Sequence, residues 1–253
     1  MILDQFKLDD RVAIVTGSAQ GLGQGIALGL AEAGADVALV DILDMSETRE
    51  QIESLGRRCV AITADLMETA CIPAIIDTTV KKLGGIDILF NNAGIIRRAP
   101  IKEFTEKDWD DVMNINIRTL FFLSQAAGKV MIEQGRGGKI VNTASMLSFQ
   151  GGILVPSYTA SKSAVMGLTR LLANELGAHD INVNAIAPGY MATENTRALR
   201  EDPARNKAIL ERIPAGRWGT PQDLQGVAVF LASAASQYLQ GYTIAVDGGW
   251  LAR

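Results

Sequence analysis

Residues 11–25 read R-V-A-I-V-T-G-S-A-Q-G-L-G-Q-G, and the predicted architecture of the chain starts from them. The first six form a short β-branched run that predicts a buried strand. Gly17, Gly21 and Gly23 follow at G-x-x-x-G-x-G spacing, and a helical pattern then runs to Gly34, which predicts a helix end. Strand, glycine turn and helix in this order predict a dinucleotide site. Missing side chains admit a pyrophosphate to the backbone, and the helix N-terminus offers free N–H groups.

The next predicted strand, D-V-A-L-V-D, ends at Asp41. In dinucleotide folds, a carboxylate placed about 20 residues after the glycines hydrogen-bonds the adenosine ribose. A polar residue that only closes a strand is the alternative. The neighbours at 18–20 and 42–43 include no Arg or Lys that could pair with a 2′-phosphate. We therefore expect the cofactor to be NAD and not NADP.

Beyond Asp41, strands and helices alternate to the end of the chain. Further strands are predicted at 59–66, 86–94, 138–145, 181–189 and 242–250, and helices at 46–56, 72–83, 103–127, 158–176 and 221–232. This rhythm predicts an α/β fold with a single Rossmann-type doubly wound parallel sheet of about seven strands, covered by helices on both faces. No linker or repeat interrupts it, so residues 1–253 are expected to be one domain. The mixed charge and prolines of residues 190–220 predict a substrate lid with short helices.

Residues 144–162, A-S-M-L-S-F-Q-G-G-I-L-V-P-S-Y-T-A-S-K, carry the candidate catalytic group. Tyr158 and Lys162 are four residues apart on a predicted helix and so share one face. A free tyrosine has a pKa near 10, and lowering it to about 7 needs about 4 kcal/mol. One cation at about 4 Å in a partly desolvated cleft supplies roughly that amount. A surface Tyr beside a solvated Lys is the alternative, and the surrounding pattern favours a general base.

The candidate functional residues all fall at the carboxyl ends of predicted strands or in the helices that follow. In an open α/β sheet this edge is where ligands bind. Asn91-Asn92-Ala93-Gly94 suits a tight backbone beside a ligand, or a plain turn. Asn116, among the apolar residues of helix 103–127, is either a satisfied core amide or a functional group.

Composition excludes several classes of protein. The chain has 253 residues, 48% of them hydrophobic and 21% charged, and a net charge of −4, which argues against nucleic acid or an anionic membrane as the partner. No apolar stretch is long enough to span a membrane, and no leader is visible. Cys59 and Cys71 fit no metal site or disulfide framework and are expected to be buried thiols. His179 is expected in a surface turn. These features predict a cytoplasmic protein without a metal.

Taken together, T-G-S-A-Q-G-L-G, N-N-A-G, Y-T-A-S-K, P-G-Y-M-A-T and V-D-G-G resemble the classical short-chain dehydrogenase/reductase family over essentially the whole chain. The resemblance implies a catalytic tetrad of Asn116, Ser145, Tyr158 and Lys162. Tyr158 would take the alcohol proton while hydride passes to nicotinamide, and Asn116 would hold a water linking Lys162 to solvent. It also implies contacts with NAD, with Asp65 at the adenine and Asn91 on the adenosine ribose side. The implied cofactor residues are Gly17, Gln20, Gly21, Leu22, Gly23, Asp41, Asp65, Leu66, Asn92, Ala93, Gly94, Tyr158, Lys162, Pro188, Gly189, Met191 and Thr193.

Within the family, N-N-A-G-I-I-R-R, S-M-L-S-F-Q-G-G and R-I-P-A-G-R-W-G are similar to members that oxidise deoxy-keto-sugar acids in pectin degradation. This implies substrate contacts by Arg97, Ser145, Gln150 and Tyr158. A substrate carboxylate in a partly dry cleft needs a cation, best a bidentate Arg. Arg97 or Arg98 is expected to supply it, and the competitors are Arg197, Arg200, Arg205 and Arg217.

Two alternatives stay open for the function. One is a short-chain dehydrogenase for another alcohol or ketone. The other is a non-catalytic NAD-binding protein, which the intact tetrad disfavours. The helices at 103–127 and 158–176 carry apolar residues on more than one face, and together with the family's habit this predicts a homotetramer with 222 symmetry.

Overall fold

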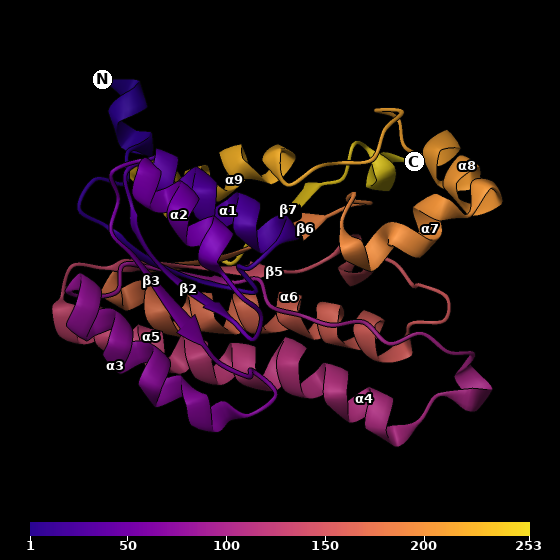
Figure 1. Cartoon of the computed structure of the whole chain (residues 1–253), viewed down its shortest axis with the longest axis horizontal. Coiled ribbons are helices and arrows are strands. Elements are labelled where there is room, and N and C mark those ends of the chain that lie inside the picture. The colour runs from indigo at the N-terminus through magenta and orange to yellow at the C-terminus, as the bar shows by residue number, and fades with distance from the viewer.

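The computed structural model describes residues 1–253 and contains one sheet of seven parallel strands (Figure 1). The strand order is β3-β2-β1-β4-β5-β6-β7. The chain therefore builds outward from β1 to β3, crosses back to β4 beside β1, and continues outward again. The predicted doubly wound fold is confirmed. The strands are β1 Val12–Thr16, β2 Asp36–Asp41, β3 Cys59–Thr63, β4 Ile88–Asn91, β5 Gly138–Thr143, β6 Ile181–Pro188 and β7 Thr243–Val246.

Helices cover both faces of the sheet. Figure 1 shows α1, α2 and α9 on one face and α3, α5 and α6 on the other. Short 3₁₀ turns complete the connections between these elements. The helices are α1 Gly21–Glu32, α2 Ser46–Ser54, α3 Ile72–Leu83, α4 Glu106–Met113, α5 Leu120–Gln134, α6 Pro156–Leu176, α7 Arg197–Glu201, α8 Pro203–Arg212 and α9 Gln222–Ala232.

Two apolar clusters lie on opposite faces of the sheet, and strand β1 contributes side chains to both. Ala13 and Val15 belong to the cluster that includes Leu30 of α1 and Leu231 of α9. Ile14 belongs to the opposite cluster, with residues of α3, α5 and α6. Successive side chains of a strand point to opposite faces, so a strand covered on both sides must be apolar throughout. This explains the continuous V-A-I-V run in place of an alternating pattern.

The predicted helix over 103–127 has a different form in the structure. Helix α4 and helix α5 are joined by a π-helical segment, Asn114–Thr119. Helix α4 begins after Thr105, whose Oγ1 accepts a hydrogen bond from the Asp108 N–H at 3.1 Å. The apolar pattern continues across the junction, so the change of helix type could not be read from it. Isolated π turns occur often at functional sites, and this one carries Asn116.

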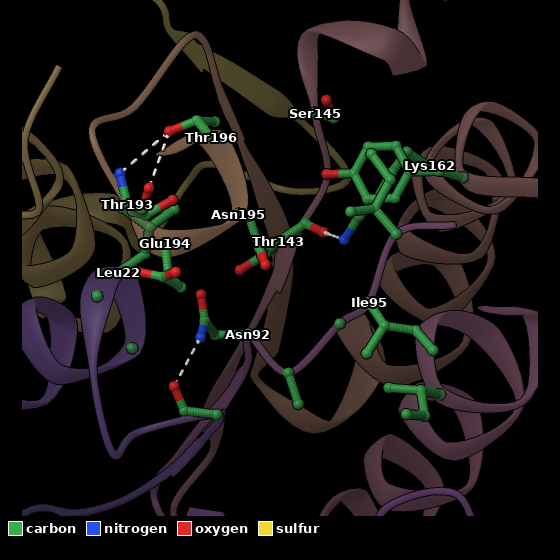
Figure 2. A pocket seen from close by; sticks show the side chains of 18 of the residues that line it. Leu22, Asn92, Ile95, Thr143, Ser145, Lys162, Thr193, Glu194, Asn195 and Thr196 are labelled. Carbon is green, nitrogen blue, oxygen red and sulfur yellow. Dashed lines mark hydrogen bonds between the residues drawn. The ribbon is translucent and has the colours of Figure 1, made fainter. Parts of the chain in front are cut away.

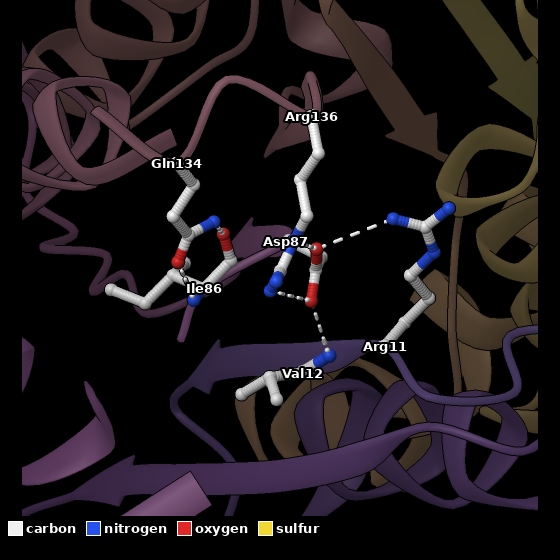
Figure 3. Close-up of polar contacts among 6 residues, drawn as sticks. All are labelled: Arg11, Val12, Ile86, Asp87, Gln134 and Arg136. Carbon is white, nitrogen blue, oxygen red and sulfur yellow. Dashed lines mark hydrogen bonds and ion pairs between the residues drawn. The ribbon is translucent and has the colours of Figure 1, made fainter. Parts of the chain in front are cut away.

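The amino-terminal edge of the sheet is held by the buried carboxylate of Asp87 (Figure 3). It accepts hydrogen bonds from the Val12 N–H at 2.9 Å, from Arg136 at 2.7 and 3.1 Å, and from Arg11 at 3.3 Å. Beside it, Gln134 exchanges two hydrogen bonds with the backbone of Ile86. The segments entering β1, β4 and β5 are thus joined at the edge opposite the strand ends where a ligand is expected.

The stretch predicted as a lid, residues 190–220, contains α7 and α8. Tyr190 packs edge-on against Trp218 and Trp250, with ring centroids 5.4 and 4.7 Å apart. Arg212 of α8 lies over the Trp250 ring at 3.9 Å. Aromatic packing therefore joins the lid to the last residues of the chain.

The cysteines differ from expectation. Cys59 and Cys71 are half-buried and not fully buried, because β3 is an edge strand and Cys71 ends a surface turn. Burial still raises the pKa of the Cys59 thiol to about 12. His179 lies in an exposed turn, as predicted. None of the helices has both the length and the apolar character needed to span a membrane.

Candidate active site

A cavity of about 750 Å³ opens at the carboxyl ends of the strands (Figure 2). Its wall is built from the turns after β1, β2, β3, β4, β5 and β6, from α6, and from the lid. It crosses the point where the strand order reverses between β1 and β4. That reversal leaves a crevice between the outgoing loops, where open α/β sheets bind their ligands.

The glycine turn shapes one side of this cavity. Gly17 and Gly21 have φ of +66° and +59°, which a residue with a side chain rarely adopts. A Cβ on Gly23 would lie 1.9 Å from the Gly17 carbonyl oxygen, so only glycine fits there. Helix α1 begins at Gly21, so its first N–H groups have no acceptor within the helix, and its first three residues line the cavity. This cradle fits a dinucleotide pyrophosphate.

Asp41 is fixed beside that turn. One carboxylate oxygen accepts from the Ala19 N–H at 2.9 Å and the other from the Leu43 N–H at 3.1 Å. Asp65, at the end of the β3 segment, lines the same cavity. The cations that line it are Arg98, Lys162 and Arg205, and none comes from the segments around Asp41 or Asp65.

Tyr158, Lys162 and Ser145 all line the cavity. Tyr158 and Lys162 lie one turn apart near the start of α6, with the Lys162 ammonium 5.6 Å from the Tyr158 ring centroid. Lys162 donates a hydrogen bond from Nζ to the Thr143 carbonyl oxygen at 2.5 Å (Figure 2). Ser145 follows β5, and its Oγ accepts from the Leu147 N–H at 3.2 Å.

The pKa of the Tyr158 phenol differs from the value expected from the sequence. Burial raises the pKa of the Tyr158 phenol, while a hydrogen bond with Ser145 and the charge of Arg98 lower it by less. Burial also lowers the pKa of Lys162 to about 8. The sequence predicted that Lys162 would bring the tyrosine pKa down at a separation of about 4 Å. In the structure the desolvation of the phenol outweighs the effects that lower its pKa, and those effects come from Ser145 and Arg98 rather than from Lys162.

Asn116 has a fully paired side chain. Its Oδ1 accepts from the Ile95 N–H at 2.9 Å, and its Nδ2 donates to the Ile95 carbonyl at 3.1 Å and to Ser161 Oγ at 3.0 Å. The amide of Asn116 is therefore fully hydrogen-bonded, and these bonds link the loop after β4 to α6. A Cβ on Gly94 would lie 3.1 Å from Asn116 Oδ1 and 3.7 Å from Lys162 Nζ, so the two side chains flank the same glycine.

Only one of the two neighbouring arginines faces the cavity. Arg98 lines it and donates from Nη2 to the Asn195 carbonyl in the lid at 3.1 Å. Arg97 lies outside the lining and forms ion pairs with Asp108 at 3.5 Å and Asp111 at 3.2 Å. The structure therefore brings Arg98, and not Arg97, to the reactive end.

Among the four arginines of residues 190–220 predicted as competitors, only one lines the cavity. Arg205 of α8 lines the cavity. Arg217 is held by both oxygens of Asp223 at 2.7 Å. Arg197 pairs with Glu194, and Arg200 donates to the Thr193 carbonyl at 3.0 Å. Gln150, predicted to contact substrate, lies outside the lining and accepts from Arg212 of α8 at 3.3 Å.

The other predicted cofactor residues nearly all reach the cavity, with three exceptions. Pro188 and Met191 are buried beneath its wall. Asn91 lies in the core, where its amide donates to Ser124 Oγ and Asn142 Oδ1, both at 2.9 Å. Its neighbour Asn92 lines the cavity instead and donates to the Thr16 and Gly17 carbonyls at 3.1 and 3.2 Å (Figure 2). Asn91 is the last residue of β4 and Asn92 the first of the loop that follows, so their side chains lie in different surroundings.

The structure adds lining residues that sequence reasoning missed. Thr143 is buried at the cavity wall, and its hydroxyl has no hydrogen-bond partner. Its place at the end of a predicted strand, two residues before Ser145, was the available signal. Ile115 comes from the π-helical segment. The other additional lining residues come from the loops and from residues 190–220, whose course the sequence pattern does not predict: Ile42, Leu43, Ala64, Ile95, Ile96, Met146, Leu147, Gly152, Ile153, Leu154, Val155, Tyr190, Glu194, Asn195, Thr196 and Leu199.

Comparisons with known proteins agree with this geometry. A family model described as enoyl-(acyl carrier protein) reductase matches residues 17–251. A curated protein of Escherichia coli strain K12, named 2-dehydro-3-deoxy-D-gluconate 5-dehydrogenase, is 65% identical over 253 residues, 100% of both chains. A solved structure from Agrobacterium tumefaciens, provisionally described as a 2-deoxy-D-gluconate 3-dehydrogenase with bound NADP, has a TM-score of 0.93 and 55% identity over 99% of this chain and 100% of its own.

A third comparison is with a solved structure that contains both a nucleotide and tartrate. The solved structure of a gluconate 5-dehydrogenase from Burkholderia cenocepacia, in complex with NADP and tartrate, has a TM-score of 0.94 and 40% identity. It matches over the full length of both chains. The chain is thus similar in sequence and in fold to dehydrogenases named for sugar acids.

Proposed function

The chain belongs to the short-chain dehydrogenase/reductase family of oxidoreductases, and we propose that it uses NAD to oxidise 2-dehydro-3-deoxy-D-gluconate at its C5 hydroxyl. The observation that carries the proposal is the meeting of three features in one cavity. These are the glycine cradle at Gly17–Gly23, the pair Tyr158 and Ser145, and the cation Arg98. Full-length similarity to the Escherichia coli enzyme of that name supports the substrate.

The proposed mechanism divides the work among these side chains. Tyr158 takes the proton of the substrate hydroxyl as general base. Ser145 donates a hydrogen bond to the substrate oxygen, where negative charge gathers. The glycine cradle at Gly17–Gly23 would hold the nicotinamide cofactor, which would supply the hydride acceptor for the carbon that carries this oxygen. In ketone reduction the protonated Tyr158 returns its proton to the oxygen.

Lys162 and Asn116 support Tyr158. The buried Lys162 ammonium stands one turn along α6, where its charge favours the tyrosinate over the phenol. Asn116 and Lys162 flank Gly94, which supports a proton path from Lys162 to solvent through a water near Asn116. The Asn116 amide is already paired, so we propose that this side chain acts in the path by fixing the Ile95 backbone.

Arg98 is proposed to hold the substrate carboxylate. It is the cavity-lining cation whose field reaches Tyr158, and a guanidinium can bind a carboxylate through two hydrogen bonds. Arg205 lines the lid side of the same cavity. We also propose that residues 190–220 act as the substrate lid of a one-domain enzyme, with Arg98 and Asn195 joining lid and body.

The nucleotide is proposed to be NAD. Asp41 has no cation beside it that could pair with a 2′-phosphate, and its own charge would repel one. The related structures from Agrobacterium tumefaciens and Burkholderia cenocepacia contain NADP. We propose that Asp41 sets the preference of this chain for NAD.

The proposed oligomer is a homotetramer with 222 symmetry. Trp109, Phe122 and Leu171 lie exposed on α4, α5 and α6, and Tyr238 and Tyr242 lie exposed before and at the start of the β7 segment. Apolar side chains on the outer side of covering helices favour a second layer of protein. Light scattering at micromolar concentration should give four times the monomer mass. A monomer under those conditions would exclude the assembly.

The function is tested with the purified enzyme and a panel of substrates. NAD reduction is followed with 2-dehydro-3-deoxy-D-gluconate, D-gluconate, 2-deoxy-D-gluconate and a neutral secondary alcohol. The proposal predicts the highest kcat/KM for the first acid. Activity confined to the neutral alcohol, or to gluconate, would replace the proposed substrate while leaving the reaction class in place.

A further inference from the structure

Leu154 has an unusual backbone for a bulky apolar residue. Its φ is +65°, in the left-handed region. The other non-glycine residues with positive φ are Asp10 and Asp180, and a short polar side chain tolerates that region better. Gly151 and Gly152, just upstream, would adopt it without strain, yet neither does. The strain therefore falls on a residue badly suited to it.

Leu154 belongs to the wall of the cavity and not to the core of the fold. Leu154 lines the cavity and remains 50% exposed, so it gains little from burial in the core. Its carbonyl oxygen accepts a hydrogen bond from the Ala99 N–H at 3.0 Å. That bond fastens the loop before α6 to the loop after β4, and holds the strained turn in place. Strained backbone that packing does not explain is found mainly at functional sites.

The position of Leu154 along a bound substrate follows from these contacts, and this step rests on the proposed function. Ser145 and Tyr158 receive the reacting carbon, C5, and Arg98 receives the carboxylate, C1. Leu154 stands four residues before Tyr158 and is bonded to the residue after Arg98. Because Leu154 lines the same cavity as Ser145, Tyr158 and Arg98, we place it beside the carbons that join C1 to C5. The middle one, C3, carries no hydroxyl in 2-dehydro-3-deoxy-D-gluconate.

We propose that Leu154 determines specificity by presenting an apolar wall to C3 of the substrate. A methylene group makes no hydrogen bonds with water, so it loses none when it lies against leucine. A hydroxyl at the same carbon would give up its hydrogen bonds with water and find no partner there. The neighbouring cavity side chains Ile96, Leu147 and Ile153 are also apolar and extend the wall. Leu154 thus selects deoxy acids over their hydroxylated counterparts.

The test compares two acids that differ by one hydroxyl, 2-dehydro-3-deoxy-D-gluconate and 2-dehydro-D-gluconate. The kcat/KM for the deoxy acid is divided by the kcat/KM for the hydroxylated acid, in the unaltered enzyme and in Leu154→Asn. Asparagine accepts a left-handed backbone and has nearly the size of leucine, but it can hydrogen-bond a C3 hydroxyl. The ratio should fall roughly tenfold or more in this variant. Leu55→Asn, at the exposed end of α2 and away from the cavity, is the control and should keep the original ratio.

The backbone strain at Leu154 can be tested separately from hydrogen bonding to the substrate. Leu154→Gly and Leu154→Ala both remove the wall, so KM for the deoxy acid should rise in each, but only glycine relieves the left-handed backbone. Leu154→Gly should therefore unfold at a higher temperature than Leu154→Ala, although glycine also raises the entropy of the unfolded chain. An unfolding temperature of Leu154→Gly equal to or below that of Leu154→Ala would overturn this part of the inference.

The outcomes also separate the inference from the function on which it rests. If the unaltered enzyme oxidises neither acid, the proposed function fails and the inference fails with it. If it oxidises the deoxy acid but Leu154→Asn changes the ratio by less than about a factor of two, Leu154 is not the selecting residue and the proposed function stands. An unaltered enzyme that uses both acids equally well likewise overturns the selection.

Discussion

Arg98 donates a hydrogen bond to the backbone carbonyl of Asn195 at 3.1 Å, across 97 positions of sequence. The bond joins the loop after β4 to the lid, and both residues line the cavity. Arg97, its neighbour in the chain, is instead tied to α4 through Asp108 and Asp111. Adjacent arginines of the same chemistry therefore have different surroundings, and they form a natural pair of test and control.

Replacing Arg98 with Met should raise the KM for the acid substrate about 10- to 100-fold, because a charge-assisted hydrogen bond is lost while the apolar stem is kept. The KM for a neutral alcohol should change little. Arg97→Met, the matched control, should leave both values near those of the unaltered enzyme. Steady-state kinetics with both substrates measure the difference. Equal losses for acid and neutral substrates would place the carboxylate elsewhere, with Arg205 the next candidate.

Tyr158→Phe should lower kcat by at least the roughly 10²–10⁴ typical of general acid–base catalysis, since it removes the proton carrier and keeps the ring. The NAD affinity should be largely unchanged, as measured by fluorescence titration, because the glycine cradle is untouched. Turnover near that of the unaltered enzyme would end the role assigned to this tyrosine.

Asp41→Ala should narrow the preference for NAD over NADP. The carboxylate that repels a 2′-phosphate and bonds the ribose is removed, although the Ala19 and Leu43 N–H groups then lose their acceptor. The ratio of kcat/KM for the two cofactors reports the change. Equal use of both cofactors by the unaltered enzyme would contradict the assignment of NAD.

Lys162→Met should stabilise the protein while abolishing turnover. Burial lowers the pKa of Lys162 from 10.5 to about 8, so below pH 8 the folded state keeps an ammonium ion out of water at a cost in free energy. Without it the free energy of unfolding at pH 7 should rise by about 1–3 kcal/mol, after allowance for the lost bond to Thr143.

The stability gained by Lys162→Met should depend on pH. Between pH 8 and 10.5 the unfolded chain binds the lysine proton and the folded chain does not, so the stability of the unaltered protein rises with pH in that window. The advantage of Lys162→Met should shrink over the same range. Urea unfolding at pH 7, 9 and 10.5 measures it. An advantage that stays constant with pH would show that the lysine does not titrate in the folded protein as described.

Residue types and their spacing were enough to predict the architecture and many of the residues that line the cavity. Gly17, Gly21 and Gly23 predict a cradle because glycine adopts positive φ without strain and leaves room for close backbone contact, and the residue type alone reveals this. Ser145, Tyr158 and Lys162 were predictable because each lies at a strand end or on one helix face, where local periodicity places the side chain. The motifs together were specific enough to indicate the family.

Features that depend on distant segments could be found only in the folded chain. Arg97 and Arg98 could not be separated by sequence, because the choice depends on α4 and on the lid, which pack against the loop from elsewhere in the chain. The pKa of Tyr158 could not be derived from its spacing to Lys162, because burial by the whole fold opposes the charge. Local spacing fixes which side chains are neighbours along an element. Desolvation, lid contacts and the left-handed turn at Leu154 arise only when separate elements close around the same volume.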